Sequence, residues 1–204
     1  VIDAATDEVI AEIKAGDKPR GAALSGNGRW LYVSDQPHNA LVRIDTATNQ
    51  VAGKIDLGES PEGVSSSPDG KWIAAASEIS NAVNFIDAAS GKKIFAIKTR
   101  GKNPEHAVFS PDSRLMLVSA EEADSVDVID VKKRRQIASI KVGDRPRGVA
   151  FRPDGKVAYV ACEIASKVYA IDVAKRAVIK EITTGTFSNG VTMAPDGSRV
   201  FISN

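Results

Sequence analysis

Three short motifs recur along this chain at a nearly constant interval, and this repetition constrains the fold more than any other feature. The first motif is an apolar residue followed by aspartate, and its aspartates are Asp3, Asp45, Asp87, Asp130 and Asp172. They are 42 residues apart, except for one interval of 43. Repeats of this length are typical of solenoids, propellers and other repeat arrays.

The other two motifs keep the same phase. A turn of the Ser-Pro-Asp-Gly type begins at Ser25, Ser67, Ser110, Arg152 and Ala194. A Pro-x-Gly motif, which is degraded in the last repeat, begins at Pro19, Pro61, Pro104, Pro146 and Ser188. In the turn, proline presets φ and glycine accepts a positive φ, so each copy predicts a tight reversal between two strands.

Each repeat predicts four short strands, and no stretch shows a helical period with caps. Strand A follows Pro-x-Gly, and strand B follows the tight turn. Strand C alternates with period 2, as in 125–129, and strand D follows a polar turn. The aspartate that ends strand C is expected to bind backbone amides of that turn. Four-stranded antiparallel sheets repeated about one axis form a β-propeller, so the predicted fold is all-β.

The chain is predicted to be a single propeller domain. The expected full blades are 17–58, 59–101, 102–143 and 144–185. Residues 1–16 would supply the end of a strand C and a strand D, and 186–204 would supply strands A and B. The two halves could join as a fifth blade and close a small ring. We instead expect an arc of a seven- or eight-bladed ring, with a leader and further blades outside this sequence.

Composition limits the class of protein. Apolar residues make up 43% of the 204 residues and charged residues 26%, which is typical of a soluble globular chain. A net charge of +1 gives no general attraction to nucleic acid or to an anionic membrane. No apolar run is long enough to span a membrane. Cys162 is the only cysteine, so no intrachain disulfide can form.

Three predicted B strands, 31–35, 158–162 and 200–204, resemble the Tyr-Val-Thr-Asn motif of the YVTN propellers. Within that family, two stretches are similar to the propellers associated with PQQ-dependent catabolism: 61–87, with its Ser67–Trp72 turn, and 118–130. The resemblance implies a seven-bladed, exported, periplasmic protein encoded near quinoprotein alcohol dehydrogenases. It supplies no catalytic residues. The quinone and haem ligands of related oxidoreductase propellers have no counterpart here, and fold kinship alone does not transfer their chemistry.

Two sets of loops are expected to open on one face, around the mouth of the central channel. The D–A loops place at the x position of Pro-x-Gly the residues Arg20, Glu62, Glu105, Arg147 and Asn189. The B–C loops contribute Gln36, Glu78, Glu121 and Glu163. We interpret this ring as a binding site for a cation, a polar ligand or a charged partner loop. The alternative is exposed Arg–Glu pairing between blades, which contributes about 0–1 kcal/mol per pair.

The remaining candidate residues give weaker signals. His106 replaces the glycine of one Pro-x-Gly motif, where it is either a ligand or proton carrier beside Glu105 or a tolerated substitution. His38 is expected in a solvated loop, Cys162 as a buried inert thiol, and the basic run 132–135 in a solvated turn on the opposite face. No haem-attachment, phosphate-loop, zinc-peptidase or serine-hydrolase motif is present.

The sequence therefore predicts a non-catalytic propeller that binds a protein partner or a small polar ligand at the channel mouth, and it assigns no cofactor and no metal. The predicted ligand-binding residues are Arg20, Glu62, Glu78, Glu105, His106, Glu121, Arg147 and Glu163. The alternatives are a propeller subunit of a quinoprotein or haem oxidoreductase and a structural repeat protein of the cell surface.

Overall fold

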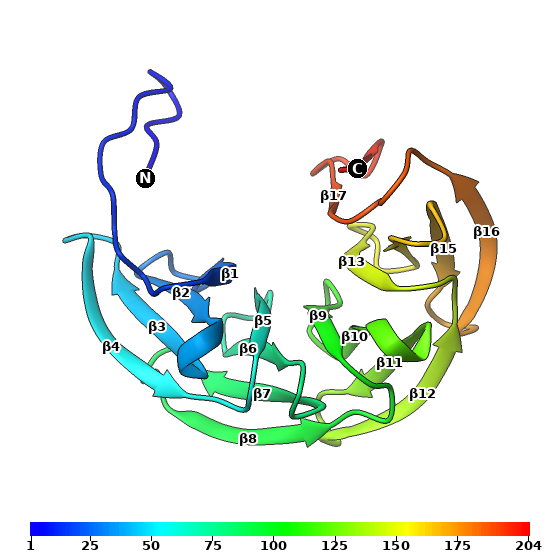
Figure 1. Cartoon of the computed structure of the whole chain (residues 1–204), viewed down its shortest axis with the longest axis horizontal. Helices are drawn as coiled ribbons and strands as arrows, with labels where there is room; N and C mark the ends of the chain where they lie inside the picture. Colours follow the sequence, from blue (N-terminus) through cyan, green and yellow to red (C-terminus); the bar gives the residue numbers. More distant parts are fainter.

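The computed structural model describes all residues, 1–204, and shows four antiparallel sheets of four strands each, arranged along an arc (Figure 1). The first sheet comprises β1 (Pro19–Leu24), β2 (Trp30–Asp35), β3 (Ala40–Asp45) and β4 (Gln50–Asp56). The second comprises β5 (Pro61–Ser66), β6 (Trp72–Ser77), β7 (Ala82–Asp87) and β8 (Lys93–Lys98). The third comprises β9 (Pro104–Phe109), β10 (Leu115–Ala120), β11 (Ser125–Asp130) and β12 (Arg135–Lys141). The fourth comprises β13 (Pro146–Phe151), β14 (Val157–Cys162), β15 (Lys167–Asp172) and β16 (Ala177–Thr183).

Within each sheet the strands follow one another in chain order from the inside of the arc to the outside. The first strand of each repeat, β1, β5, β9 or β13, lies innermost, as predicted (Figure 1). This radial arrangement of all-β blades confirms the predicted propeller fold. Neither short helix, η1 (Gln36–His38) or η2 (Glu121–Ala123), is long and apolar enough to cross a membrane.

The tight turn between the first two strands of a blade is closed by its own side chains. In the second blade, Ser67 Oγ donates to Asp69 Oδ1 at 2.7 Å and accepts from the backbone N–H of Trp72 at 2.9 Å. Asp69 Oδ1 also accepts from the N–H of Lys71 at 3.1 Å, and Gly70 has a φ of 72°. The repeated Ser-Pro-Asp-Gly motif is therefore a local device that fixes the angle between strands.

The repeated aspartate at the end of the third strand closes the next turn, as predicted. Asp87 Oδ1 accepts hydrogen bonds from the backbone N–H and the Oγ of Ser90, at 2.7 and 2.6 Å. Asp130 and Asp172 accept from backbone N–H groups three residues on, at 2.9 and 2.8 Å. Because these bonds favour the charged carboxylate, the two from Ser90 hold the pKa of Asp87 below its usual value.

Apolar side chains between successive sheets join the blades. Phe85 of the second blade stacks on Phe95 at 4.5 Å and meets the edge of Phe109, in the third blade, at 6.0 Å. A single buried cluster combines these two blades, and a second cluster combines the third and the fourth. Both faces of the second and third sheets are thus covered by neighbouring sheets, which makes the arc rigid.

Adjacent inner strands also approach one another closely at the glycine of Pro-x-Gly. A Cβ added to Gly21 would lie 2.6 Å from the backbone N of Val64 and 2.7 Å from the backbone O of Glu62. A Cβ on Gly148 would lie 2.5 Å from the backbone O of Asn189. Gly21 and Gly148 therefore cannot be replaced without strain, because two main chains meet there without room for a side chain.

The two ends of the chain lie on either side of the opening in the arc (Figure 1). Residues 1–16 form one antiparallel bridge, between Ile2 and Val9, and contain no strand beyond that bridge. At the other end, β17 (Val191–Met193) pairs with β18 (Val200–Ile202). The two ends share no sheet, so the structure does not contain the alternative five-bladed ring.

The turn aspartate gives a prediction with a pH dependence. Asp87→Ala should lower the melting temperature at pH 7 by about 2–4 °C, the effect of losing about 1 kcal/mol of hydrogen bonding. Because the folded pKa lies below the unfolded one, this stability is present above the unfolded pKa and is lost as the pH falls through the folded value. Thermal unfolding followed by circular dichroism should therefore show the difference between wild type and variant narrowing below pH 3.8. Glu12→Ala, an exposed carboxylate without a hydrogen bond, should show no difference at either pH.

The close approach of inner strands gives a second prediction. Gly21→Ala should lower stability by about 1–3 kcal/mol, because the new methyl group meets backbone atoms of the next blade. The matched control is Gly53→Ala in β4, where an added Cβ meets nothing within 4 Å. That substitution should leave the urea midpoint unchanged or raise it slightly, since glycine is unfavourable within a strand. Equal urea midpoints for the two variants would contradict a backbone contact at Gly21.

Candidate functional site

A bulge at the start of each inner strand positions the charged residues of the channel mouth. In the pairing of β5 with β6, Pro61 lies opposite Ser77 and Val64 lies opposite Ala75. The two residues between Pro61 and Val64 therefore face a single residue of β6. The same shift occurs in the other three blades. Bulges redirect side chains, and in these four blades the x residue of the Pro-x-Gly motif lies within one. The sequence motif thus has a second role, which is to aim one side chain per blade.

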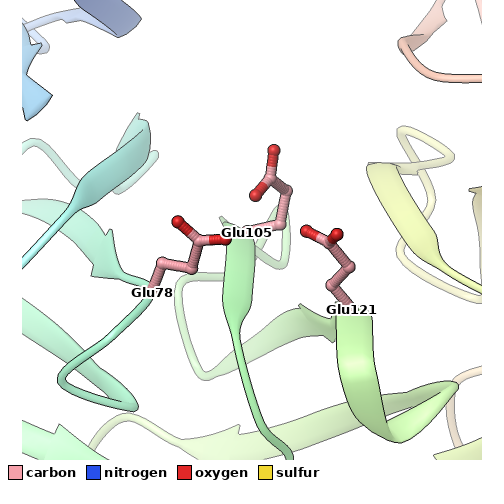
Figure 2. A group of neighbouring side chains, drawn as sticks. All are labelled: Glu78, Glu105 and Glu121. Atoms are coloured by element: carbon pink, nitrogen blue, oxygen red, sulfur yellow. The ribbon is translucent and has the colours of Figure 1, made fainter.

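The loops after the second strands supply the remaining carboxylates. Glu78 follows β6, Glu121 begins η2 directly after β10, and Glu163 follows β14. Figure 2 shows Glu78, Glu105 and Glu121 pointing toward one another from three separate segments of two adjacent blades. We use the term mouth cluster for the charged side chains that meet here: Arg20, Glu62, Glu78, Glu105, Glu121, Arg145, Arg147 and Glu163.

Arg147 holds one half of the mouth cluster together. Its Nη1 lies 2.6 Å from Glu105 Oε1 and 3.1 Å from Glu121 Oε2. Its Nε donates to Glu163 Oε2 at 2.7 Å. One guanidinium from the fourth blade therefore binds carboxylates of both the third and the fourth blade.

Arg145, which the sequence analysis missed, adds a second guanidinium on the same side. Its Nε lies 2.5 Å from Glu121 Oε1 and 3.5 Å from Glu163 Oε2. The signal was the doubled arginine around a proline in Arg145-Pro146-Arg147, which no other repeat carries.

The other half of the mouth cluster is built around Glu62. Arg20 Nε donates to Glu62 Oε2 at 2.6 Å, and the Gln36 side-chain amide donates to the other oxygen of Glu62. Ser60 Oγ donates to Glu78 Oε2 at 2.8 Å. Arg20 also lies 3.8 Å from Glu105, which connects the two halves. The network is therefore continuous across four blades.

The structure contains the Arg–Glu pairs between blades that the alternative interpretation predicted, but their carboxylates are buried, whereas Arg20 and Arg145 stay partly exposed. Glu62 and Glu105 are 3% and 4% exposed. These side chains are buried because the inner strands approach one another closely, which narrows the channel mouth around them. Burying an ion pair carries a large desolvation penalty. Removing one partner of a buried pair therefore lowers stability far more than removing one partner of an exposed pair.

Burial also shifts the acidity of the carboxyl groups. Burial raises the pKa of Glu105 to about 7, with help from the negative charges of Glu62, Glu121 and Glu78 and against the opposing effect of Arg147. Glu105 Oε2 is buried without a hydrogen-bond partner. Burial likewise raises the pKa of Glu62, although its pairing with Arg20 opposes the shift. Both shifts show that the arginines do not fully offset the effect of burial on the charged form of these carboxyl groups.

His106 does not join the network. It occupies the glycine position within the bulge, so its ring lies against Gly63 of the preceding blade rather than among the carboxylates. Its Nδ1 is buried without a hydrogen-bond partner, and its side chain forms no ion pair. Burial lowers the pKa of His106 to about 4, and the charges of Arg147 and Arg20 act in the same direction. The ring is therefore neutral at pH 7.

The remaining candidates lie outside the mouth cluster. His38 Nδ1 lies 2.8 Å from Asp35 in the first blade. Cys162 is fully buried, and burial raises the pKa of its thiol to about 12, as expected of an inert residue. Lys133 pairs with Asp130 in the turn between β11 and β12. None of them contacts the carboxylates of the channel mouth.

Burial of the network gives a third prediction. Arg147→Ala should lower stability by about 3–5 kcal/mol, because Glu105 and Glu121 stay buried without their shared cation. The matched control is Lys133→Ala, whose ion pair with Asp130 is mostly exposed and should contribute no more than about 1 kcal/mol. Urea unfolding of both variants measures the difference, and equal losses would show that the mouth cluster does not depend on Arg147.

Comparisons with known proteins agree with the fold. The family model described as "Lactonase, 7-bladed beta-propeller" matches residues 100–204, just over half of the chain. No curated protein sequence matches the chain.

Three solved structures share the fold. A chain of Kuenenia stuttgartiensis hydrazine synthase is 25% identical, with a TM-score of 0.84 over 96% of this chain. A functionally unknown protein from Desulfotomaculum acetoxidans DSM 771 is 18% identical, with a TM-score of 0.80 over 91% of this chain. The Cps50 (Swd1) β-propeller domain of Myceliophteria thermophila is 14% identical, with a TM-score of 0.82 over 96% of this chain. The alignments cover 57%, 62% and 64% of those chains, so this chain spans less than two thirds of each.

Proposed function

The chain belongs to the lactonase, seven-bladed β-propeller family, and we propose that it is a binding propeller whose ligand or protein partner docks at the channel mouth. One observation carries this proposal: charged residues from four blades converge at the mouth, and their carboxylates outnumber their guanidiniums by five to three. A purely structural network would gain most from balanced charge. The surplus negative charge favours a cationic or hydrogen-bond-donating group from outside the chain.

The surplus is concentrated on Glu78 and Glu105. Glu78 accepts a hydrogen bond from Ser60 and pairs with no arginine or lysine. Glu105 shares Arg147 with two other carboxylates and leaves one oxygen unpaired. Loops held by a rigid ring are common sites of recognition, because the ring fixes their geometry while their sequence varies.

The resemblance to YVTN propellers supports a narrower form of this proposal. By that resemblance, the protein acts in the periplasm beside a PQQ-dependent oxidation system and is itself non-catalytic. Its partner would be a quinoprotein dehydrogenase that presents a basic segment to the mouth. Charge complementarity of this kind mainly increases the association rate and the specificity of a complex.

Biolayer interferometry with a purified PQQ-dependent alcohol dehydrogenase tests this function, in buffer containing EDTA. We expect binding that weakens as salt rises from 0.05 to 0.5 M, and at least tenfold weaker binding by Glu78→Gln. The control is Glu181→Gln on the outer strand β16, which pairs only with the exposed Lys167 and should bind as wild type does. Binding that is insensitive to Glu78→Gln, or no binding at all, would reject this partner.

Lactone hydrolysis is a second candidate function, because the family model that matches residues 100–204 is described as a lactonase. The unpaired Oε2 of Glu105 can accept a proton from water, while Arg147 at 2.6 Å from the other oxygen can stabilise developing negative charge. Titration of acid released from γ-butyrolactone and δ-valerolactone tests it. Turnover that disappears in Glu105→Gln would establish a catalytic role, and no turnover above the uncatalysed rate would exclude one for these substrates.

A propeller that forms part of a redox enzyme is a third candidate, in line with the hydrazine synthase structure that shares its fold. A visible absorption spectrum of the purified protein separates it from the binding role, because a bound haem gives a Soret band. The cell-surface alternative predicts an anchor or additional domains in the complete reading frame.

A further inference from the structure

Three carboxylates from different segments meet within the mouth cluster. Glu78, Glu105 and Glu121 each offer an oxygen that lies within 4.8 Å of the oxygens of the other two. Figure 2 shows the three side chains converging from the loop after β6, from β9 and from η2. Three like charges held this close repel one another, and Arg147 pairs with only two of them.

An independent observation points to a missing ligand. Glu105 is 4% exposed, yet its Oε2 has no hydrogen-bond partner. Figure 2 shows the Glu105 carboxylate above and between those of Glu78 and Glu121, with one oxygen turned toward them and the other turned away. Buried polar atoms are nearly always paired with protein, water or an ion, so an unpaired carboxylate oxygen at this position indicates a bound group.

The charge balance narrows the identity of that group. Arg147 and Arg145 pair with Glu121, Arg147 pairs with Glu105, and Glu78 has no cationic partner. Across the mouth cluster, five carboxyl groups face three guanidiniums, which leaves two negative charges when every carboxyl group is ionised. One divalent cation would neutralise them.

We propose that Glu78, Glu105 and Glu121 bind one hard divalent cation, for which Ca²⁺ has the most suitable size. Oxygens that lie about 2.3–2.6 Å from a calcium ion are less than about 5 Å apart, which matches the carboxylates of the trio. The trio contains only oxygen donors, which favours calcium, magnesium or manganese over zinc or copper. This inference rests on the proposed binding function and names a ligand for the same mouth.

At Glu105 burial favours an ion over the side chain of a partner, whereas the half-buried Glu78 is accessible to both. A lysine would have to pass its whole stem into a space where Glu105 is almost inaccessible, whereas a single ion needs only a narrow path. Two of the three ligands already share a guanidinium, which reduces the negative charge of the site. Since calcium affinity depends on ligand charge, we expect a dissociation constant of about 10⁻⁵–10⁻³ M.

Isothermal titration of CaCl₂ into protein freed of metal with EDTA tests the site. We expect one ion per chain, together with a rise in melting temperature at 10 mM Ca²⁺ and a smaller rise at 10 mM Mg²⁺. Glu78→Gln should weaken Ca²⁺ binding at least tenfold. This variant should still fold, because Glu78 is only half-buried and no ion pair depends on it.

The matched control is Glu122→Gln, an exposed carboxylate directly beside Glu121 in η2, which should leave Ca²⁺ affinity unchanged. No binding up to 10 mM Ca²⁺, or binding that persists in Glu78→Gln, would overturn the proposal. If Ca²⁺ does not bind while the dehydrogenase still binds the mouth in EDTA, only the cation site is wrong. If neither binds, the proposed function fails with it.

Discussion

Adjacent inner strands meet at the glycine of Pro-x-Gly with their main chains in contact, and the geometry of the whole channel mouth depends on that approach. A Cβ on Gly21, Gly63 or Gly148 would lie less than 3.0 Å from backbone atoms of the next blade. The same motif carries a bulge in each of the four complete sheets, and the bulge turns the preceding side chain toward the mouth. Tight packing of the blades and the position of the charged residues therefore have one structural origin.

The repeat length explains why the charges pair as they do. Arg20 and Glu62 are 42 residues apart, as are Glu105 and Arg147, and both pairs are hydrogen-bonded. Each pair joins equivalent positions of neighbouring blades. Equivalent positions of successive repeats lie next to one another around the propeller axis. Where one repeat has arginine and the next has glutamate at the same position, the two side chains can form an ion pair between blades.

Burial gives this network its chemical character. On an open surface the same ion pairs would contribute little to stability. Glu62 and Glu105 are only 3% and 4% exposed, so their charged forms lower stability unless a cation pairs with them. The arginines satisfy most of the carboxylates, and the remaining deficit falls on Glu78 and Glu105. A site that is rigid, buried and short of positive charge is suited to binding a cation, whether it belongs to a partner or is a free ion.

The sequence alone determined the features that depend on contacts within a few residues. The Ser-Pro-Asp-Gly turn and the aspartate that closes the next turn bind groups two to five positions away, so their roles could be predicted from one repeat. The phase of the motifs then gave four strands per blade and an innermost first strand. It also placed Arg20, Glu62, Glu105 and Arg147 at equivalent points.

Only the tertiary structure decided what happens between blades. It buried the carboxylates of Glu62, Glu105 and Glu121, brought Arg145 to Glu121, and kept the ring of His106 against Gly63, outside the network. It also formed a single antiparallel bridge within residues 1–16, between Ile2 and Val9. These outcomes depend on the distance and rotation between successive sheets, which the packing of apolar side chains sets and which no single repeat encodes.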